Sequence, residues 1–238
     1  MANVPIYPLL FFLLLYNLLT GHIPFLVSIF LANPLVGIST ILGLIIGISV
    51  HEAAHAFVAY RLGDPTAQLA GRLTLNPAAH LDPIGTFALL FIGLGWGKPT
   101  PFDPFNLRNI KRDSALISVA GAASNFLIAG LIAAPYLIAF YTNSLSAQIN
   151  NIYTYLVPVI FFNLILGTFN LIPIAPLDGF KVLAGLLPKD WYYEFIQTEK
   201  YGIFILLIFL ITGAISRIIF PIVAFLFGIL VPGFSSPF

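Results

Sequence analysis

The sequence predicts an all-α polytopic membrane protein with about five to six transmembrane helices, a short membrane-associated β-sheet and one re-entrant segment. Of the 238 residues, 59% are hydrophobic and only 8% are charged, whereas about 25% of the residues in a soluble domain are charged. Apolar segments that approach the ~20 residues of a membrane-spanning helix alternate with short polar segments. Residues 1–238 are therefore expected to form one integral-membrane domain.

The composition also excludes several kinds of site and partner. The chain contains no cysteine, so disulfide bonds and thiolate metal sites are excluded, and any metal ion must be bound by His, Asp or Glu. The formal net charge of +1 gives no indication of a nucleic-acid partner. No basic region precedes the N-terminal apolar segment, so we expect a retained span and not a cleaved signal peptide.

The N-terminal third of the chain predicts two spans. Residues 6–33 form one kinked span, or a span followed by an interfacial piece, because Gly21 and Pro24 interrupt them. Pro34 begins a second span, which is stopped by the Gly-Asp-Pro sequence at residues 63–65.

Shorter elements follow the second span. Residues 66–76 alternate polar and apolar side chains, which predicts a short strand with one wet face. Residues 83–97 are apolar but only about 15 residues long, so we expect a re-entrant or interfacial hairpin. Residues 98–113 form a polar, proline-rich loop.

The remainder of the chain predicts three or four more spans. Residues 114–141 and 153–172 form the third and fourth spans, and residues 181–200 are mixed and interfacial. Residues 201–231 are apolar apart from Arg217 and make one or two further spans.

The distribution of lysine and arginine predicts the orientation. These residues gather in segments 63–113 and 178–200 and are absent from the connections 33–37 and 142–152. The positive-inside rule therefore places the first two segments on the cytoplasmic side. We expect a protein of a prokaryotic cytoplasmic membrane whose active site lies toward the cytoplasm.

Three polar residues in the second span carry the clearest chemical signal. His51 and His55 are four residues apart, so on a helix both imidazoles face the same side, one turn apart. With Glu52 they form the H-E-x-x-H pattern of zinc hydrolases. Because burying a carboxylate in a span costs about 2.5–3.5 kcal/mol, a functional role is expected. The alternative is that the motif faces a cytoplasmic vestibule and only caps the span.

Asp178 is the best candidate for the third protein ligand that a catalytic zinc ion needs. No other acidic residue lies between Asp113 and Asp190. Pro173 and Pro176 break the helix before it, which suits a segment that lines a wet cavity. The alternative is that Asp178 N-caps the helix that follows.

Two asparagines and a second acid–histidine pair have more than one interpretation. The amide of Asn170 or Asn125 is suited to donate to the oxyanion of a tetrahedral intermediate, and interhelical hydrogen bonding is the alternative for each. His80 and Asp82 suggest a second metal site, but a turn with a hydrogen-bonded histidine is the simpler interpretation.

Four stretches of the sequence resemble the site-2 protease family of intramembrane zinc metalloproteases. Together they cover about residues 50–182, within an expected catalytic core of about residues 34–182. The matching stretches are VHEAAHAFVAYRLGDPTAQLAGRLTLNPAAHLDPIGT, GWGKPTPFDPFNLRN, AGAASNF and FNLIPIAPLDGFKV. One departure is the third-span sequence GAASN, in which the family often has proline in place of the first alanine. PDZ and nucleotide-sensing domains, which some relatives carry, are not expected here.

The resemblance implies both a cofactor and a set of residue roles. One Zn²⁺ ion per chain would be held by His51, His55 and Asp178. Glu52 would be the general base, and Asn170 would help to polarise the scissile carbonyl, with Asn125 as a supporting candidate. The 66–76 strand would belong to a small membrane-embedded sheet, whose edge is suited to bind an extended substrate by strand addition.

The expected function is hydrolysis of peptide bonds in or near the transmembrane segments of membrane proteins. The partners are then transmembrane-helix substrates and the lipid bilayer, with homo-oligomerisation left open. One alternative is an ion or proton transporter that uses the buried His and Glu, although the chain has no inverted repeats. A non-catalytic membrane scaffold is the other alternative.

Overall fold

The computed structural model describes residues 25–92 and 95–234 of the chain. In these ranges three helices are long and apolar enough to cross a membrane, and they are α3 (Pro34–Arg61), α7 (Ile110–Tyr141) and α8 (Ala147–Asn170). A fourth candidate is the helical segment Lys189–Ile211 together with Ala214–Leu230, bent by 75° between them. The described residues thus hold three or four candidate spans, and the total of five to six stays a prediction.

The beginning of α3 is defined by its cap. The side-chain oxygen of Asn33 accepts hydrogen bonds from the backbone N–H groups of Leu35 and Val36, and Pro34 occupies the first helical position. Helix α2 (Phe25–Ala32) precedes this cap and packs against α3. It is the described part of the first predicted span, whose earlier residues lie outside the described ranges.

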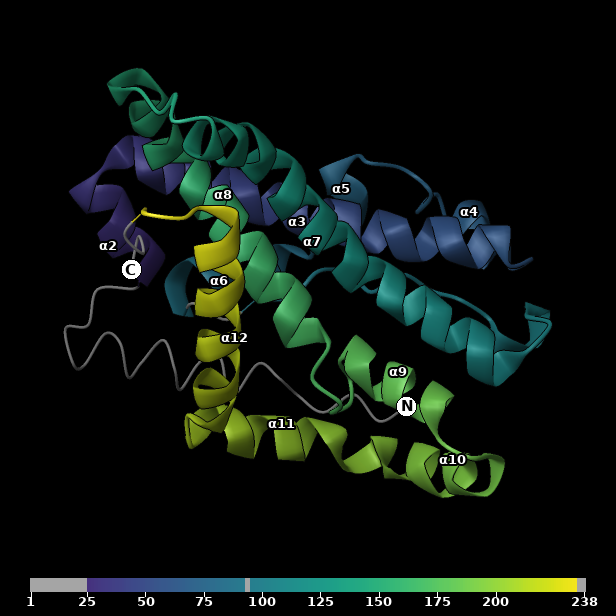
Figure 1. Cartoon of the computed structure of the whole chain (residues 1–238). Helices are drawn as coiled ribbons and strands as arrows, with labels where there is room; N and C mark the ends of the chain where they lie inside the picture. Colours follow the sequence, from purple (N-terminus) through teal and green to yellow (C-terminus); the bar gives the residue numbers. More distant parts are fainter. Residues whose placement is uncertain (1–24, 93–94, 235–238) are drawn as a thin grey trace.

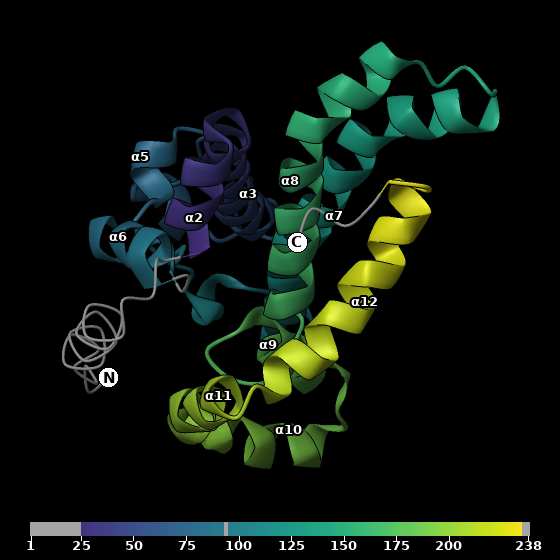
Figure 2. The ribbon, with the colours of Figure 1, turned by 90° about the vertical axis from the view of Figure 1, so that its left-hand side faces the viewer.

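Helices α3, α7 and α8 pack against one another and form the centre of the molecule. Figure 2 shows α8 between α3 on one side and α12 (Ala214–Leu230) on the other. Small residues on α3 allow α8 to approach closely, as is typical of membrane helices. A Cβ atom at Gly43 would lie 2.9 Å from the Cα atom of Val159, and one at Gly47 would lie 2.8 Å from the Leu166 side chain.

The C-terminal helices close one end of this centre. Figure 1 shows α10 and α11 running across that end before the chain turns into α12. Helix α9 packs on α7, where Gly185 leaves room for the Ala115 side chain. The elements of this region are α9 (Asp178–Leu186), α10 (Lys189–Ile196), the short 3₁₀ helix η2 (Gln197–Tyr201) and α11 (Gly202–Ile211).

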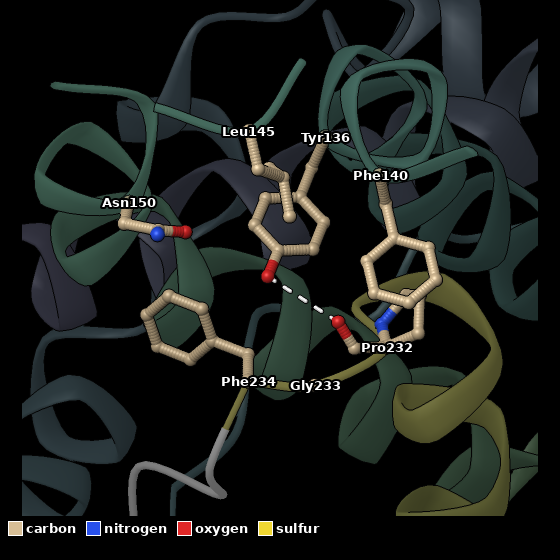
Figure 3. A pocket seen from close by; sticks show the side chains of 7 residues that line it. All are labelled: Tyr136, Phe140, Leu145, Asn150, Pro232, Gly233 and Phe234. Atoms are coloured by element: carbon tan, nitrogen blue, oxygen red, sulfur yellow. Dashed lines mark hydrogen bonds between the residues drawn. The ribbon is translucent and has the colours of Figure 1, made fainter. Parts of the chain in front are cut away.

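Toward the other end of α7 and α8, two tyrosines form a polar cluster. Next to Pro135, the Tyr153 hydroxyl enters the hydrogen-bond ladder of α7, because it accepts from the Tyr136 N–H at 3.1 Å and donates to the Ile132 carbonyl at 2.7 Å. The Tyr136 hydroxyl donates to the Pro232 carbonyl at 3.3 Å, beside a cavity of about 350 Å³ (Figure 3).

The strand predicted at residues 66–76 is wrong. Thr66–Leu69 forms the helical turn α4, and Gly71 then adopts a left-handed conformation with φ +69°. Asp64 starts this turn because its carboxylate accepts hydrogen bonds from the N–H and hydroxyl groups of Thr66. No strand occurs in the described residues, where the single isolated β-bridge joins Leu81 and Gly97, so the predicted β-sheet is not found.

The predicted hairpin at residues 83–97 does reverse direction. Helix α6 (Pro83–Ile92) follows the short helix α5 (Pro77–His80). The chain then returns along α6, because Trp96 lies against Gly85 and Gly97 forms an antiparallel bridge with Leu81. A Cβ atom at Gly85 would lie 2.2 Å from the Trp96 carbonyl oxygen, so only glycine allows this approach. Whether the hairpin enters the bilayer stays a prediction.

Candidate metal centre

Two histidines of α3 and the first residue of α9 bring three ligand atoms together. His51 and His55 are buried and lie one turn apart on α3. The Asp178 Oδ2 atom lies 3.1 Å from His51 Nε2 and 3.2 Å from His55 Nε2. One ligand atom from each residue lies within 4.8 Å of the other two. The predicted metal ligands, which come from two distant parts of the chain, therefore meet at one point.

Asp178 reaches the histidines because the chain turns sharply between α8 and α9, through the irregular residues 171–177. Gly179 makes this turn possible, since a Cβ atom there would lie 2.2 Å from the Leu171 carbonyl oxygen. The N-cap of α9 is Leu177, which makes no side-chain capping bond. The alternative of Asp178 as the N-cap is therefore wrong, and its carboxylate faces the two histidines instead.

The hydrogen bond made by Nδ1 of each imidazole determines whether Nε2 presents a lone pair or a proton to Asp178. His55 Nδ1 lies 2.7 Å from the Ile117 carbonyl oxygen, which only accepts, so Nδ1 carries the proton and Nε2 has the lone pair. His51 Nδ1 lies 2.7 Å from the oxygen of the Asn125 amide. The Asp178 Oδ2 atom is buried and receives no hydrogen bond from any described residue. With both imidazoles neutral, three lone pairs thus face one another.

A positive ion between these three atoms removes their mutual repulsion. Neutral imidazole nitrogen and carboxylate oxygen are ligands that Zn²⁺ takes in proteins, and a catalytic zinc site has three such protein ligands. Metal-bound histidines also donate their other N–H group to an oxygen acceptor, as both histidines do here. The donor set and the unmatched oxygen of Asp178 therefore fit a zinc ion.

Gly121 of α7 packs against the two imidazole rings. A Cβ atom at this position would lie 2.5 Å from Nε2 and Cε1 of His55 and 2.6 Å from Cε1 of His51. The backbone of α7 therefore lies directly against the rings. The absence of a side chain here is a condition for the observed ring positions.

A cavity of about 150 Å³ lies beside the ligands and contains the other polar groups of the centre. Glu52 lines it, and one carboxylate oxygen, Oε2, accepts a 2.8 Å hydrogen bond from the Thr100 N–H. The Thr100 hydroxyl also donates to the Glu52 carbonyl at 3.0 Å. Lys181 lines the same cavity, with its Nζ atom 4.5 Å from the centre of the Phe102 ring. Thr100 thus holds the Glu52 carboxylate at the wall of the cavity.

The loop that carries Thr100 is fastened to the end of α3 by Asp64. The fully buried Asp64 carboxylate accepts hydrogen bonds from the Asp103 N–H and the Asn106 side-chain amide, each at 2.8 Å, besides those from Thr66. Burial opposes ionisation of this carboxyl, but the hydrogen bonds from Thr66, Asn106 and Asp103 hold its pKa below the ordinary value. Asp64 therefore connects the position of this loop to the end of the motif helix.

The two candidate asparagines occupy different environments. Asn170 lines the cavity and donates one amide hydrogen to the Leu166 carbonyl at 3.0 Å, which leaves its other amide hydrogen without an acceptor among the described residues. Asn125 is fully buried, and its amide nitrogen donates to the Gly47 carbonyl at 3.1 Å and to Asn163 Oδ1 at 3.0 Å. Both amide hydrogens of Asn125 are therefore used within the protein.

The second metal site considered at His80 and Asp82 is not found. His80 is buried, with Nε2 2.7 Å from the Thr74 carbonyl oxygen, and Asp82 accepts a hydrogen bond from the Gly85 N–H at the start of α6. Throughout residues 25–92 and 95–234, His51, His55 and Asp178 form the one group of three potential ligands. The turn interpretation of these two residues is confirmed.

The sequence reasoning did not single out Thr100, Asn163 or Lys181. Asn163 carries a signal, because it is a polar residue within a span, about two helical turns before Asn170. Lys181 lies one turn after Asp178 on the amphipathic helix α9, which was a weaker signal. No local pattern marks Thr100, since its contact with Glu52 depends on how a long loop folds.

Comparisons with known proteins connect this centre to a family. The model of peptidase family M50 matches residues 135–213, which include Asn170 and Asp178. The Bacillus subtilis protein named "Putative zinc metalloprotease YwhC" is 36% identical over 183 residues, which cover 76% of this chain and 84% of that protein. No solved structure matches the chain.

Two mycobacterial proteins, both named "Putative zinc metalloprotease Rip2", are also similar. The one from Mycolicibacterium smegmatis is 30% identical over 195 residues, covering 80% of this chain and 73% of that protein. The one from Mycobacterium tuberculosis H37Rv is 27% identical over 198 residues, covering 81% and 74% respectively.

Proposed function

Because the chain belongs to peptidase family M50, the site-2 protease family, we propose that it hydrolyses peptide bonds in or near the transmembrane segments of membrane proteins. We propose that His51, His55 and Asp178 hold one Zn²⁺ ion. The observation that carries this proposal is the buried Asp178 Oδ2 atom, which faces two imidazole lone pairs and receives no hydrogen bond from the described residues. Zinc bound there would supply a Lewis acid that acidifies water and polarises a carbonyl group.

Glu52 is assigned the role of general base. Its Oε2 atom is held by the Thr100 N–H, while its Oε1 atom has no hydrogen-bond partner among the described residues and belongs to a side chain that lines the cavity. A carboxylate held in this way takes a proton from the attacking water and then delivers it to the nitrogen of the leaving amine.

Asn170 is assigned the role of oxyanion donor. Its second amide hydrogen is free to point into the cavity, where negative charge develops on the substrate carbonyl oxygen. Asn125 was the supporting candidate for this role, but both of its amide hydrogens are bound to acceptors within the protein. We therefore assign oxyanion stabilisation to Asn170 alone.

The membrane location sets two conditions on the substrate and on water. The carbonyl groups of a transmembrane helix are hydrogen-bonded internally, so the substrate must unwind locally before it is cleaved. The polar side chains of the cavity provide a place for water, and the lysine and arginine distribution favours entry from the cytoplasmic side.

Two variants and one control test this proposal in purified protein. The measurements are zinc bound per chain and cleavage of a single-span model substrate, with the products mapped by mass spectrometry. Glu52→Gln is expected to keep zinc and the fold and to lower the cleavage rate about 10²–10⁴-fold, the usual contribution of general acid–base catalysis. Asp178→Asn is expected to lose bound zinc, and Asp190→Asn, an exposed acid on α10, is expected to match the wild type.

Cleavage by Glu52→Gln at the wild-type rate, or wild-type zinc affinity in Asp178→Asn, would contradict these assignments. An ion transporter would instead show flux across a vesicle membrane without substrate cleavage. A scaffold would tolerate Glu52→Gln in every assay.

A further inference from the structure

Asn163 is a buried polar residue of α8 that does not line the active-site cavity. Its amide nitrogen donates to the Val159 carbonyl at 2.8 Å, and its Oδ1 atom accepts a 3.0 Å hydrogen bond from the Asn125 amide nitrogen. Asn125 in turn contacts His51, so three side chains form a chain of hydrogen bonds from α8 through α7 to α3. This chain ends at a proposed zinc ligand.

The chemistry of the end groups fixes the direction of every bond in this chain. The carbonyl oxygen of Val159 only accepts, so the NH₂ group of Asn163 must face it and Oδ1 must face Asn125. The carbonyl oxygen of Gly47 likewise only accepts, so the NH₂ group of Asn125 must face Gly47 and Asn163. The Asn125 oxygen is then the atom left to face His51 Nδ1, at 2.7 Å.

We infer that Asn163 is a positioning residue that acts through Asn125 to keep His51 in the tautomer with its proton on Nδ1 and its lone pair on Nε2. An amide oxygen only accepts, so His51 must donate from Nδ1. Its Nε2 atom, 3.1 Å from Asp178 Oδ2, is thereby kept as a metal ligand. This inference rests on the proposed function, because it assigns the role of His51 to zinc binding.

The two histidines differ in what enforces their tautomer. His55 donates to the backbone carbonyl of Ile117, which cannot rotate away or exchange a donor for an acceptor. His51 depends on a side-chain amide, which presents a donor when it turns over about its last torsion. Without the oxygen of Asn163, only the Gly47 carbonyl opposes this reversal, and a reversed Asn125 would favour the proton on His51 Nε2, directed at Asp178. The second amide therefore reinforces the Gly47 carbonyl in holding the tautomer of His51, whereas His55 needs no such support.

Gly47 preserves the geometry of this relay, the chain of hydrogen bonds from Asn163 through Asn125 to His51. A Cβ atom at Gly47 would lie 3.0 Å from Asn163 Oδ1, so a side chain there would push against the oxygen that binds Asn125. Gly47 also supplies its carbonyl as the second acceptor for Asn125. The glycine thus serves the relay through its backbone and through its lack of a side chain.

The test measures zinc affinity by competition with a chelator, alongside the thermal stability of the zinc-free protein. Asn163→Leu removes the oxygen and keeps a similar volume, and we expect zinc affinity to fall about 10–100-fold, as for loss of other contacts that orient a metal ligand. Tyr153→Phe is the matched control, because it removes a different buried hydrogen-bonding group from α8 and should leave zinc affinity unchanged. Asn163→Asp retains an oxygen acceptor toward Asn125 and should lose less affinity than Asn163→Leu, which keeps the test valid if the leucine variant does not fold.

A double-mutant cycle separates action through Asn125 from general packing. In an Asn125→Ala background, Asn163→Leu should cause no further loss of zinc affinity, because the intermediate link is already missing. Additive losses, or wild-type zinc affinity in Asn163→Leu, would overturn the relay. Asp178→Asn in the same assay distinguishes an error in the relay from an error in the zinc centre. If either of these outcomes is found while the wild type binds zinc and Asp178→Asn does not, only the relay is in error.

Discussion

Two buried polar clusters lie along the α7–α8 pair, and they use their hydrogen-bonding groups differently. In the tyrosine cluster, the Tyr153 hydroxyl accepts one hydrogen bond and donates another, both to the backbone of α7 near Pro135. In the ligand cluster, His51, Asn125 and Asn163 are also joined by hydrogen bonds, but the lone pair of His51 Nε2 and the Asp178 oxygen are left facing each other.

The difference shows how a buried polar group that supports the fold is told from one that performs chemistry. Polar residues within spans indicate function by default, yet the tyrosines use their donors and acceptors to compensate for an interrupted helix. The ligand cluster retains acceptors that no donor in the described structure matches. Several acceptors that converge on one point without a donor, where burial makes each of them costly, are the feature that indicates a bound cation.

The largest effect that tests the difference between the two clusters is expected from a substitution at Gly121, beside the ligand cluster. Gly121→Ala places a methyl group within 2.6 Å of both imidazole rings, so the rings must move apart from their present positions. We expect zinc affinity to fall at least about 10–100-fold, the range seen when ligand orientation is lost, and cleavage to fall with it. Zinc affinity is measured by chelator competition.

Gly130→Ala on the same helix is the control for this substitution. A Cβ atom there meets no other atom within 4 Å, so zinc affinity should stay at the wild-type value. If Gly121→Ala and Gly130→Ala bind zinc equally well, the ring positions described here are incorrect.

A smaller effect, of a different kind, is expected in the tyrosine cluster. Tyr153→Phe removes one acceptor and one donor from the interrupted part of α7, and the free energy of unfolding should fall by about 1–2 kcal/mol. Zinc affinity should not change, and saturating zinc should stabilise this variant as much as it stabilises the wild type. A change in zinc affinity would mean that the two clusters are coupled and that the contrast between them is false.

The smallest effect is expected outside the membrane, at Asp64. Asp64→Asn should lower the free energy of unfolding by about 1 kcal/mol near pH 7, because the amide keeps one oxygen for the loop donors. The native pKa of Asp64 is below its ordinary value of 3.8, so the carboxylate stabilises the fold at higher pH and this stabilisation is lost as the pH falls below about 4.

The difference in stability between the wild type and Asp64→Asn should therefore shrink in acid, as followed by denaturant unfolding at several pH values. A difference that stays constant from pH 7 to pH 3 would show that folding does not change the pKa of Asp64. If Asp64→Asn shifts the loop that carries Thr100, cleavage should fall more than zinc affinity, since Thr100 contacts Glu52 and not the ligands.

The residues that sequence reasoning located are those whose geometry is set by local periodicity. His51, Glu52 and His55 follow from the helical repeat. Asp178 was a candidate because acids are scarce and prolines precede it, and the resemblance to the site-2 protease family then favoured zinc ligation over an N-cap. The strand at 66–76 failed because Asp64, two residues upstream, binds Thr66 and begins a helical turn, a local contact that outweighs the alternating pattern.

Other contacts depend on how distant segments pack, and the sequence does not contain them in local form. Thr100 reaches Glu52 across 48 positions of the chain, and Asn125 meets Asn163 only because α7 and α8 cross at that level. Gly121 lies against the imidazole rings only because α7 packs on α3.

The connection between α7 and α8, at residues 142–146, divides the components of the centre between two parts of the chain. The part before it carries both imidazoles, the general base and Asn125, and the part after it carries the third ligand, Asn163 and Asn170. Neither part alone holds a complete centre. A chain severed at this connection would thus be inert as separate pieces, and regained cleavage on mixing them would report their reassembly in the bilayer.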